Sequence, residues 1–128
     1  MEALTVQSEH RFGGYRVQGR GAASDDLVAD ALALQDAGAF SVVLEMVPAQ
    51  VAKRITAELE IPTIGIGAGV DCDAQVMVWQ DLAGLRGGTA PRFVKKYADL
   101  RGVLSDAVRR YAEDVRQGGY PGPEHSYE

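Results

Sequence analysis

The chain has few of the features that mark secreted, membrane-spanning or nucleic-acid-binding proteins. Its single cysteine, Cys72, cannot form a disulfide within the chain and fits a reducing compartment. It contains no apolar run of about 18 residues or more, so we expect no segment that crosses a bilayer. It also lacks an excess of basic residues. The formal net charge of −5 disfavours nucleic acid and anionic membrane surfaces as partners.

Residues 1–10 contain acidic side chains and no apolar core segment, so we expect no secretory signal and a cytoplasmic protein. The composition, 46% hydrophobic and 24% charged, is that of an ordinary soluble protein with enough apolar residues for one core. We therefore expect residues 1–128 to form a single domain.

The first third of the chain changes from a glycine-rich segment to an amphipathic one. Residues 5–23 have several glycines and few periodic apolar positions, which predicts an ordered loop. Ser24 is a suitable N-cap for a helix that Gly38 would end. The β-branched run at residues 40–44 then predicts a strand that is buried on both faces.

The middle of the chain repeats this alternation of strand and helix. Apolar residues four positions apart, at Val51, Ile55 and Leu59, predict a helix that starts near Pro48, because proline is tolerated in a first helical turn. Residues 63–69 predict the next strand.

The last third of the chain predicts one more strand and two helices. Residues 75–79 form a short apolar run that favours a strand. Phe93 and Tyr97, four apart, predict one C-terminal helix. Residues 104–115 predict a second helix, which Gly118 would end.

Strands that alternate with helices imply parallel pairing through crossover helices, which is an α/β fold. About three strands are visible, whereas a closed eight-stranded barrel takes about 250 residues. We therefore expect about three parallel strands with flanking helices and two C-terminal helices. The pattern fits part of a (β/α)8 barrel or a small open sheet.

Glu45 is the candidate catalytic residue. It directly follows the strand predicted at residues 40–44, at the carboxyl end where active sites of α/β folds gather. Partial burial there would raise the pKa of a carboxyl group, which suits a general base. The structural alternative is a surface glutamate that caps the helix beginning near Pro48.

The glycines Gly65, Gly67 and Gly69 alternate along the predicted strand at residues 63–69 and would share one of its faces. A face without side chains leaves room for a ligand or for a close approach of backbone, and the pattern does not choose between them. The dinucleotide-binding motif requires a helix directly afterwards, and the segment that follows is not helical in pattern.

Asp71, Cys72 and Asp73 follow this glycine run. Two acids beside a turn more often cap it than bind a metal, and no third ligand lies nearby in the sequence. Cys72 has no basic neighbour that would lower the pKa of its thiol, which disfavours a nucleophile.

Six blocks of the sequence, taken together, resemble the ketopantoate hydroxymethyltransferases in order and spacing. They are GGYRVQGR at residues 13–20, VLEMVP at 43–48, IPTIGIGAG at 61–69, CDAQV at 72–76, RFVKKYAD at 92–99 and PGPEHS at 121–126. The resemblance covers nearly the whole chain, and several blocks in one order are far more specific than a single glycine motif. Val6 and Ala74 depart from the proline and glycine that are usual in the family.

The resemblance implies a (β/α)8 barrel enzyme of pantothenate and coenzyme A biosynthesis. Such enzymes transfer a hydroxymethyl group from 5,10-methylenetetrahydrofolate to 2-oxoisovalerate, giving ketopantoate, and their Mg²⁺ chelates the keto acid and stabilises its enolate. The proton acceptor of the family matches Glu45 in the VLEMVP block. The family's metal-binding carboxylates and substrate-holding lysine correspond to sequence upstream of Met1. We therefore expect no metal ligand in this chain, and we assign no cofactor-binding residue.

By this interpretation the chain is the C-terminal half of a barrel, and it acts only with a complementary N-terminal half. We expect it to associate with that half or as a homo-oligomer, because open sheet edges and apolar faces favour pairing. Three alternatives are a non-catalytic remnant, another carbon–carbon bond enzyme of the same barrel superfamily, and a nucleotide-binding module that uses the glycine run.

Overall fold

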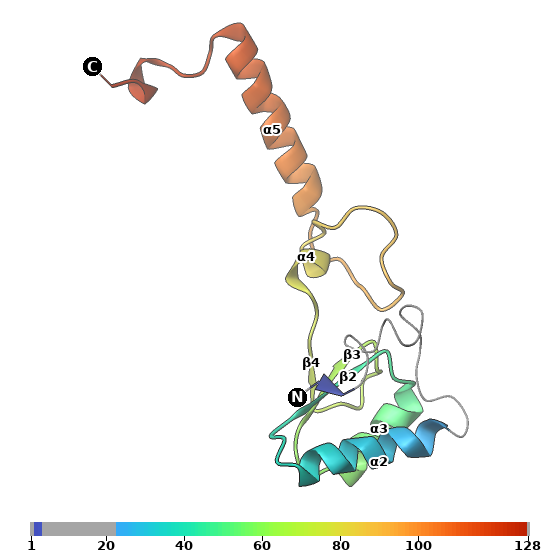
Figure 1. The fold of residues 1–128 in the computed structure, drawn as a ribbon. Helices are drawn as coiled ribbons and strands as arrows, with labels where there is room; N and C mark the ends of the chain where they lie inside the picture. Colours follow the sequence, from blue (N-terminus) through green and yellow to red (C-terminus); the bar gives the residue numbers. More distant parts are fainter. Residues whose placement is uncertain (1, 4–22, 128) are drawn as a thin grey trace. The chain divides into compact units, whose positions relative to one another are not determined.

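A computed structural model describes residues 2–3 and 23–127 of the chain (Figure 1). The chain divides into two compact units, the sheet unit at Met1–Met77 and the C-terminal unit at Val78–Glu128. The loop expected at residues 5–23 lies outside the described residues except at its last position, which begins a helix.

The sheet unit contains a four-stranded parallel sheet in the order β1-β2-β3-β4. The fold is therefore α/β, as the alternating pattern predicts. Of the strand expected at residues 75–79, only Gln75 lies in a strand, and β1 has no counterpart among the predicted strands. The strands are β1 (Glu2–Ala3), β2 (Val42–Glu45), β3 (Thr63–Ile66) and β4 (Ala74–Gln75).

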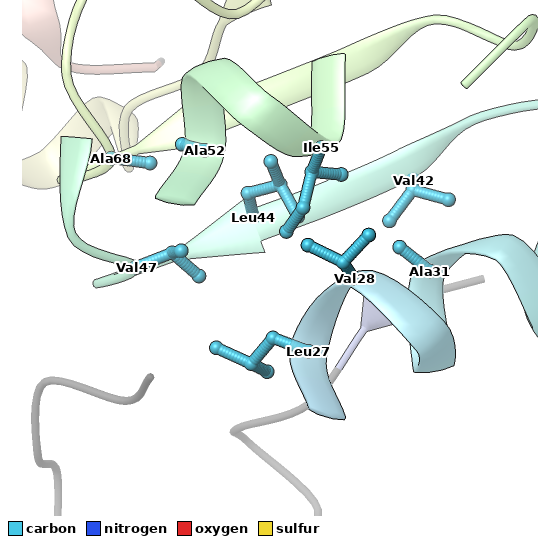
Figure 2. Packing of buried hydrophobic residues seen from close by; sticks show 9 residues of the cluster. All are labelled: Leu27, Val28, Ala31, Val42, Leu44, Val47, Ala52, Ile55 and Ala68. Atoms are coloured by element: carbon cyan, nitrogen blue, oxygen red, sulfur yellow. The ribbon is translucent and has the colours of Figure 1, made fainter. Parts of the chain in front are cut away.

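Two helices, α2 (Ala23–Asp36) and α3 (Ala49–Glu58), pack on one face of this sheet (Figure 1). Leu44 of β2 and Ile55 of α3 are 1% exposed, and their side chains point toward Val28 of α2 (Figure 2). Burial of a side chain of this size contributes about 1.5–3 kcal/mol. The core consists of Leu27, Val28, Ala31, Val42, Leu44, Val47, Ala52, Ile55 and Ala68.

The other face of β2 and β3 is covered less completely. Burial alternates along both strands, with Val42 and Leu44 buried and Val43 only half-buried. The strand expected at residues 40–44 also begins later, because Phe40 is 83% exposed and precedes the first paired residue. The expectation of burial on both faces is wrong in this detail: among the described residues, the helices cover only one face.

The ends of α2 correct one prediction and confirm another. The helix begins at Ala23, so Ser24 lies inside the first turn and is not the N-cap. Asp25 and Asp26 occupy the first turn, where acidic residues favour the positive helix end. Gly38 follows the last turn with φ 89°, a conformation that suits glycine, and ends the helix as predicted.

In the C-terminal unit, α4 (Trp79–Leu82) begins at Trp79, the last residue of the strand that was expected at residues 75–79. The helix expected around Phe93 and Tyr97 is also absent from the described residues. The backbone N–H of Tyr97 donates to the carbonyl oxygen of Leu82 at 2.8 Å, so this segment bonds to α4 and not to itself.

The second C-terminal helix is confirmed as α5 (Leu100–Gln117), and a short 3-10 helix, η1 (Pro123–His125), follows it. The side chain of Asp99 caps α5 by accepting from the N–H of Gly102 at 3.1 Å. Gly118, at φ 74°, ends the helix as predicted. Among the described residues, no helix combines the length and hydropathy needed to span a bilayer.

Candidate active site

Glu45 is the last residue of β2 and lies at the carboxyl edge of the sheet, where the sequence places it. Its register partner is Ile66, the last residue of β3, so the two strands end side by side. Alternation along β2 puts Glu45 on the face of Val43, opposite the face that α2 and α3 cover. The half-buried carboxylate therefore lies at the strand end that α/β enzymes use, on the side away from the helices.

The residue after Glu45 has an unusual backbone. Met46 has φ 53°, and it is the one non-glycine residue with positive φ among those that the structure describes. For a residue with a side chain, this left-handed conformation costs roughly 1–2 kcal/mol. Nothing in the sequence signals it, because methionine has no preference for this region.

Beyond this turn, α3 begins at the same edge of the sheet. Pro48 is its N-cap and its carbonyl oxygen accepts from the N–H groups of Val51 and Ala52, at 2.9 and 3.0 Å. Pro48, and not Glu45, occupies the N-cap position of α3, and it makes no side-chain cap hydrogen bond.

The glycine run serves close packing of the chain. A Cβ atom at Gly65 would lie 2.9 Å from Sγ of Cys72, and one at Gly69 would lie 2.6 Å from Cβ of Ala49. These glycines therefore allow the backbone to approach its own neighbours, which is one of the two uses that the sequence left open. Only Gly65 lies within β3, since Gly67 and Gly69 have φ 65° and 86° beyond the strand end.

The segment after Gly69 argues against the nucleotide-binding alternative. Residues 70–73 contain bends and no helical residue and lead directly into β4, so the helix that a dinucleotide motif requires is missing there. The return from β3 to β4 at residues 67–73 is also short, since parallel strands are usually joined by about a dozen residues or more.

Asp73 has a structural role at the opposite edge of the sheet. Its Oδ2 accepts from the backbone N–H of Thr63 at 2.8 Å and from the Thr63 hydroxyl at 3.0 Å. The backbone hydrogen bond first, and then the hydroxyl, lower the pKa of Asp73. Thr63 is fully buried and also lies 2.8 Å from the Oγ1 atom of Thr56.

The other residues of this segment also make structural contacts. Asp71 pairs with Lys53 of α3 at 3.3 Å, and half-buried Cys72 packs beside Gly65. Within the described part of the chain, no group of three His, Cys, Asp or Glu side chains could hold a metal ion. Asp71 and Asp73 therefore do not form a metal centre with other described residues.

Parallel strands, helices on one face and a carboxylate at the carboxyl edge define an α/β protein of the kind whose active sites form at strand ends. Residues 3–123 match the family described as ketopantoate hydroxymethyltransferase. The chain belongs to this family, which confirms the resemblance found in the sequence.

The curated relatives share the family's activity in their names. The proteins of Frankia alni, Saccharopolyspora erythraea and Nocardioides sp. are each named 3-methyl-2-oxobutanoate hydroxymethyltransferase. Their identities to this chain are 68%, 64% and 63%, over 97%, 98% and 97% of its length. The matched regions make up 41%, 43% and 42% of those proteins. The chain thus spans about two fifths of the length of the curated relatives it matches.

Proposed function

We propose that the chain provides the C-terminal part of a 3-methyl-2-oxobutanoate hydroxymethyltransferase, with Glu45 as its proton acceptor. The observation that carries the proposal is the position of Glu45, which ends a parallel strand inside a chain whose residues 3–123 match the family. The substrate class is a small keto acid with an acidic C–H bond beside its carbonyl group, namely 2-oxoisovalerate.

Glu45 would take a proton from the carbon beside the keto group onto one of its carboxylate oxygens. The one-carbon unit would leave 5,10-methylenetetrahydrofolate at the oxidation level of formaldehyde, with a water oxygen replacing its two C–N bonds and tetrahydrofolate released. The enolate carbon would then form the new C–C bond to this carbon, and the water-derived oxygen would take up a proton as the hydroxyl group of the product. A general base must reach its proton directly or through one water, and a half-buried strand-end carboxylate meets that requirement once substrate lies over the sheet edge.

A (β/α)8 barrel is the architecture that we propose for the complete protein. In a doubly wound sheet the helices cover both faces, whereas in a barrel they all lie outside the strands. Here α2 precedes β2, α3 connects β2 to β3, and both helices pack into one core on one face. That arrangement favours a barrel, with Glu45 on the inner side.

The described residues do not fit a magnesium site, because they contain no suitable group of ligands. The Mg²⁺ implied by the family would therefore depend on side chains outside the described residues. Its contribution when bound is to polarise the keto acid, which makes the C–H bond more acidic.

We also propose that the chain acts in the cytoplasm and in association, either with an N-terminal half or with further copies of itself. The support for association is the set of exposed apolar side chains on α5. They are Val103, Leu104, Val108, Tyr111 and Val115.

The experiment combines the chain with the N-terminal part of the Frankia alni relative and follows exchange of the substrate C–H proton in heavy water. Glu45→Gln should slow this exchange about 10²–10⁴-fold, the range for loss of a general base. The matched control is Glu60→Gln, an exposed glutamate before the amino end of β3, at the opposite edge of the sheet.

An assembled sample in which Glu45→Gln exchanges as fast as the unsubstituted protein would contradict the role of Glu45. An assembled, Mg²⁺-loaded sample without any exchange or turnover would favour the non-catalytic remnant. Turnover of a different keto acid alone would favour another carbon–carbon bond enzyme of the superfamily.

A further inference from the structure

The strained turn at Met46 is the feature of the sheet unit that the proposed chemistry has not used. Its φ of 53° lies in the left-handed region, which residues with side chains rarely adopt. Strain of this kind persists only where the surrounding structure enforces it, and it concentrates at functional sites.

Four features on the two sides of Met46 enforce the turn. On one side, Glu45 is held in register with Ile66, and the N–H of Met46 donates to the carbonyl oxygen of Ile66 at 2.9 Å. On the other side, Val47 is 2% exposed in the core, and Pro48 starts α3. The backbone of Met46 is therefore fixed from both ends.

The turn decides where the strand stops. If residue 46 continued β2 in an extended conformation, the strand would run past the edge of β3, and Val47 would fall on the same face as Glu45. The left-handed step instead turns Val47 into the core beside the helices (Figure 2). Glu45 is then left as the terminal side chain on the opposite face.

We infer that Met46 is a positioning residue, whose left-handed backbone holds the Glu45 carboxylate at the catalytic edge. The inference rests on the proposed function for its consequence in turnover, but its geometry can be tested without turnover. The backbone conformation is what matters, so the requirement at this position is access to positive φ and not a thioether side chain.

Three substitutions separate the backbone from the side chain. Met46→Gly removes the side chain but adopts positive φ readily, whereas Met46→Val is β-branched and disfavours it. Met46→Leu keeps an apolar side chain of similar size and the same backbone preference as methionine. A structural role of the side chain predicts that Gly is the worst replacement; a positioning role of the backbone predicts that Val is.

In the assembled enzyme, Met46→Val should lower kcat about 10²-fold with KM nearly unchanged, the loss expected when a catalytic group moves by about 1 Å. Met46→Gly and Met46→Leu should each lower kcat by less than about threefold, which is much less than the loss expected for Met46→Val. A Gly variant that loses as much as the Val variant would overturn the inference.

The second readout uses the chain alone, with the side-chain carboxyl carbon of Glu45 observed by NMR. Its resonance in Met46→Gly should lie near that of the unsubstituted chain, and in Met46→Val it should be displaced. If Met46→Val does not fold, displacement in Met46→Gly is by itself sufficient to refute the backbone role. Absent turnover in every assembled sample would refute the proposed function, while this resonance would still decide the role of Met46.

Discussion

The two units of the chain use their amphipathic helices in opposite ways. In the sheet unit, α2 and α3 bury apolar side chains against β2. In the described part of the C-terminal unit, α5 is the longest helix, yet it buries none of its side chains, and Val108 is 66% exposed. Apolar residues four positions apart occur in both α3 and α5. Periodicity therefore specifies a helix and the face that it will bury, but not the surface that will cover that face.

The largest expected effect tests this contrast in stability. Ile55→Ala, in the core of the sheet unit, should lower the free energy of unfolding by about 2–5 kcal/mol because it leaves a cavity. Val108→Ala, on the exposed face of α5, should change it by less than about 0.5 kcal/mol in dilute solution. Urea denaturation of both variants measures the difference. Equal losses would show that the face of α5 is buried in the isolated chain.

A smaller difference is expected within the C-terminal unit, between two glycines with similar backbones. Gly84 and Gly88 have φ 69° and 81°, but a Cβ at Gly84 would overlap the carbonyl oxygen of Ala98, while one at Gly88 meets nothing. Gly88→Ala should therefore cost only the conformational penalty of about 1–2 kcal/mol. Gly84→Ala should cost a further 1–3 kcal/mol or so from overpacking.

The amide of Tyr97 reports this difference directly, because it bonds to the carbonyl of Leu82 in the segment that Gly84 lets approach. Its hydrogen exchange should accelerate more in Gly84→Ala than in Gly88→Ala. Similar exchange rates in the two variants would mean that the close approach is not required.

Local signals in the sequence predict much of the sheet unit, since each element there carries its own pattern. The spacing of Val51, Ile55 and Leu59 gives α3, and Gly38 gives the end of α2. The position of Glu45 at a strand end follows from the apolar run before it. The resemblance to the family, which rests on several blocks, is confirmed by the match over residues 3–123. The catalytic role of Glu45 stays a prediction.

The errors fall where distant contacts decide the local structure. Phe93 and Tyr97 have helical spacing, but the segment bonds to α4, and no pattern along the chain reveals that pairing. Trp79 ends an apolar run that fits a strand, yet the carbonyl oxygen of Val78 accepts from the N–H groups of Asp81 and Leu82, and a helix starts there. The strained backbone of Met46 is likewise set by its neighbours and not by its own preference.

The next prediction concerns the exposed face of α5 and our proposal that the chain associates. The chain should not be a monodisperse monomer at micromolar concentration, because an apolar helix face of this length favours burial against a partner. Leu104→Glu should weaken self-association at least about tenfold, or about 1.4 kcal/mol. Ser105→Glu, one position along the same helix, is the control for added charge. Analytical ultracentrifugation decides this, and a 13.7 kDa monomer with cooperative unfolding would contradict association.

The smallest expected effect lies in the sheet unit, at the hydrogen bonds between Asp73 and Thr63. These bonds lower the pKa of Asp73 in the folded chain, with the Thr63 backbone N–H as the main cause. A lowered folded pKa means that the carboxylate stabilises the fold above its unfolded pKa, and that this contribution disappears as pH falls through the folded value. In Asp73→Asn, the free energy of unfolding should therefore fall less steeply as the pH drops below about 4, the region of an ordinary aspartate pKa. This low-pH part of the stability curve is its acid limb.

Because Asp73 is exposed to solvent, its contribution should be smaller than that of any core residue. Asp36→Asn, at the exposed end of α2, is the matched control for the loss of one carboxylate. Thermal unfolding between about pH 3 and pH 7 compares the two variants with the unsubstituted chain, over a range that spans the titration of aspartate. A limb that is equally steep in Asp73→Asn and in the unsubstituted chain would show that these hydrogen bonds do not couple proton binding to folding. In that case other carboxylates would cause the acid sensitivity of the sheet unit. The hydrogen bonds between Asp73 and Thr63 would then hold the segment before β4 against the start of β3 without making stability depend on pH.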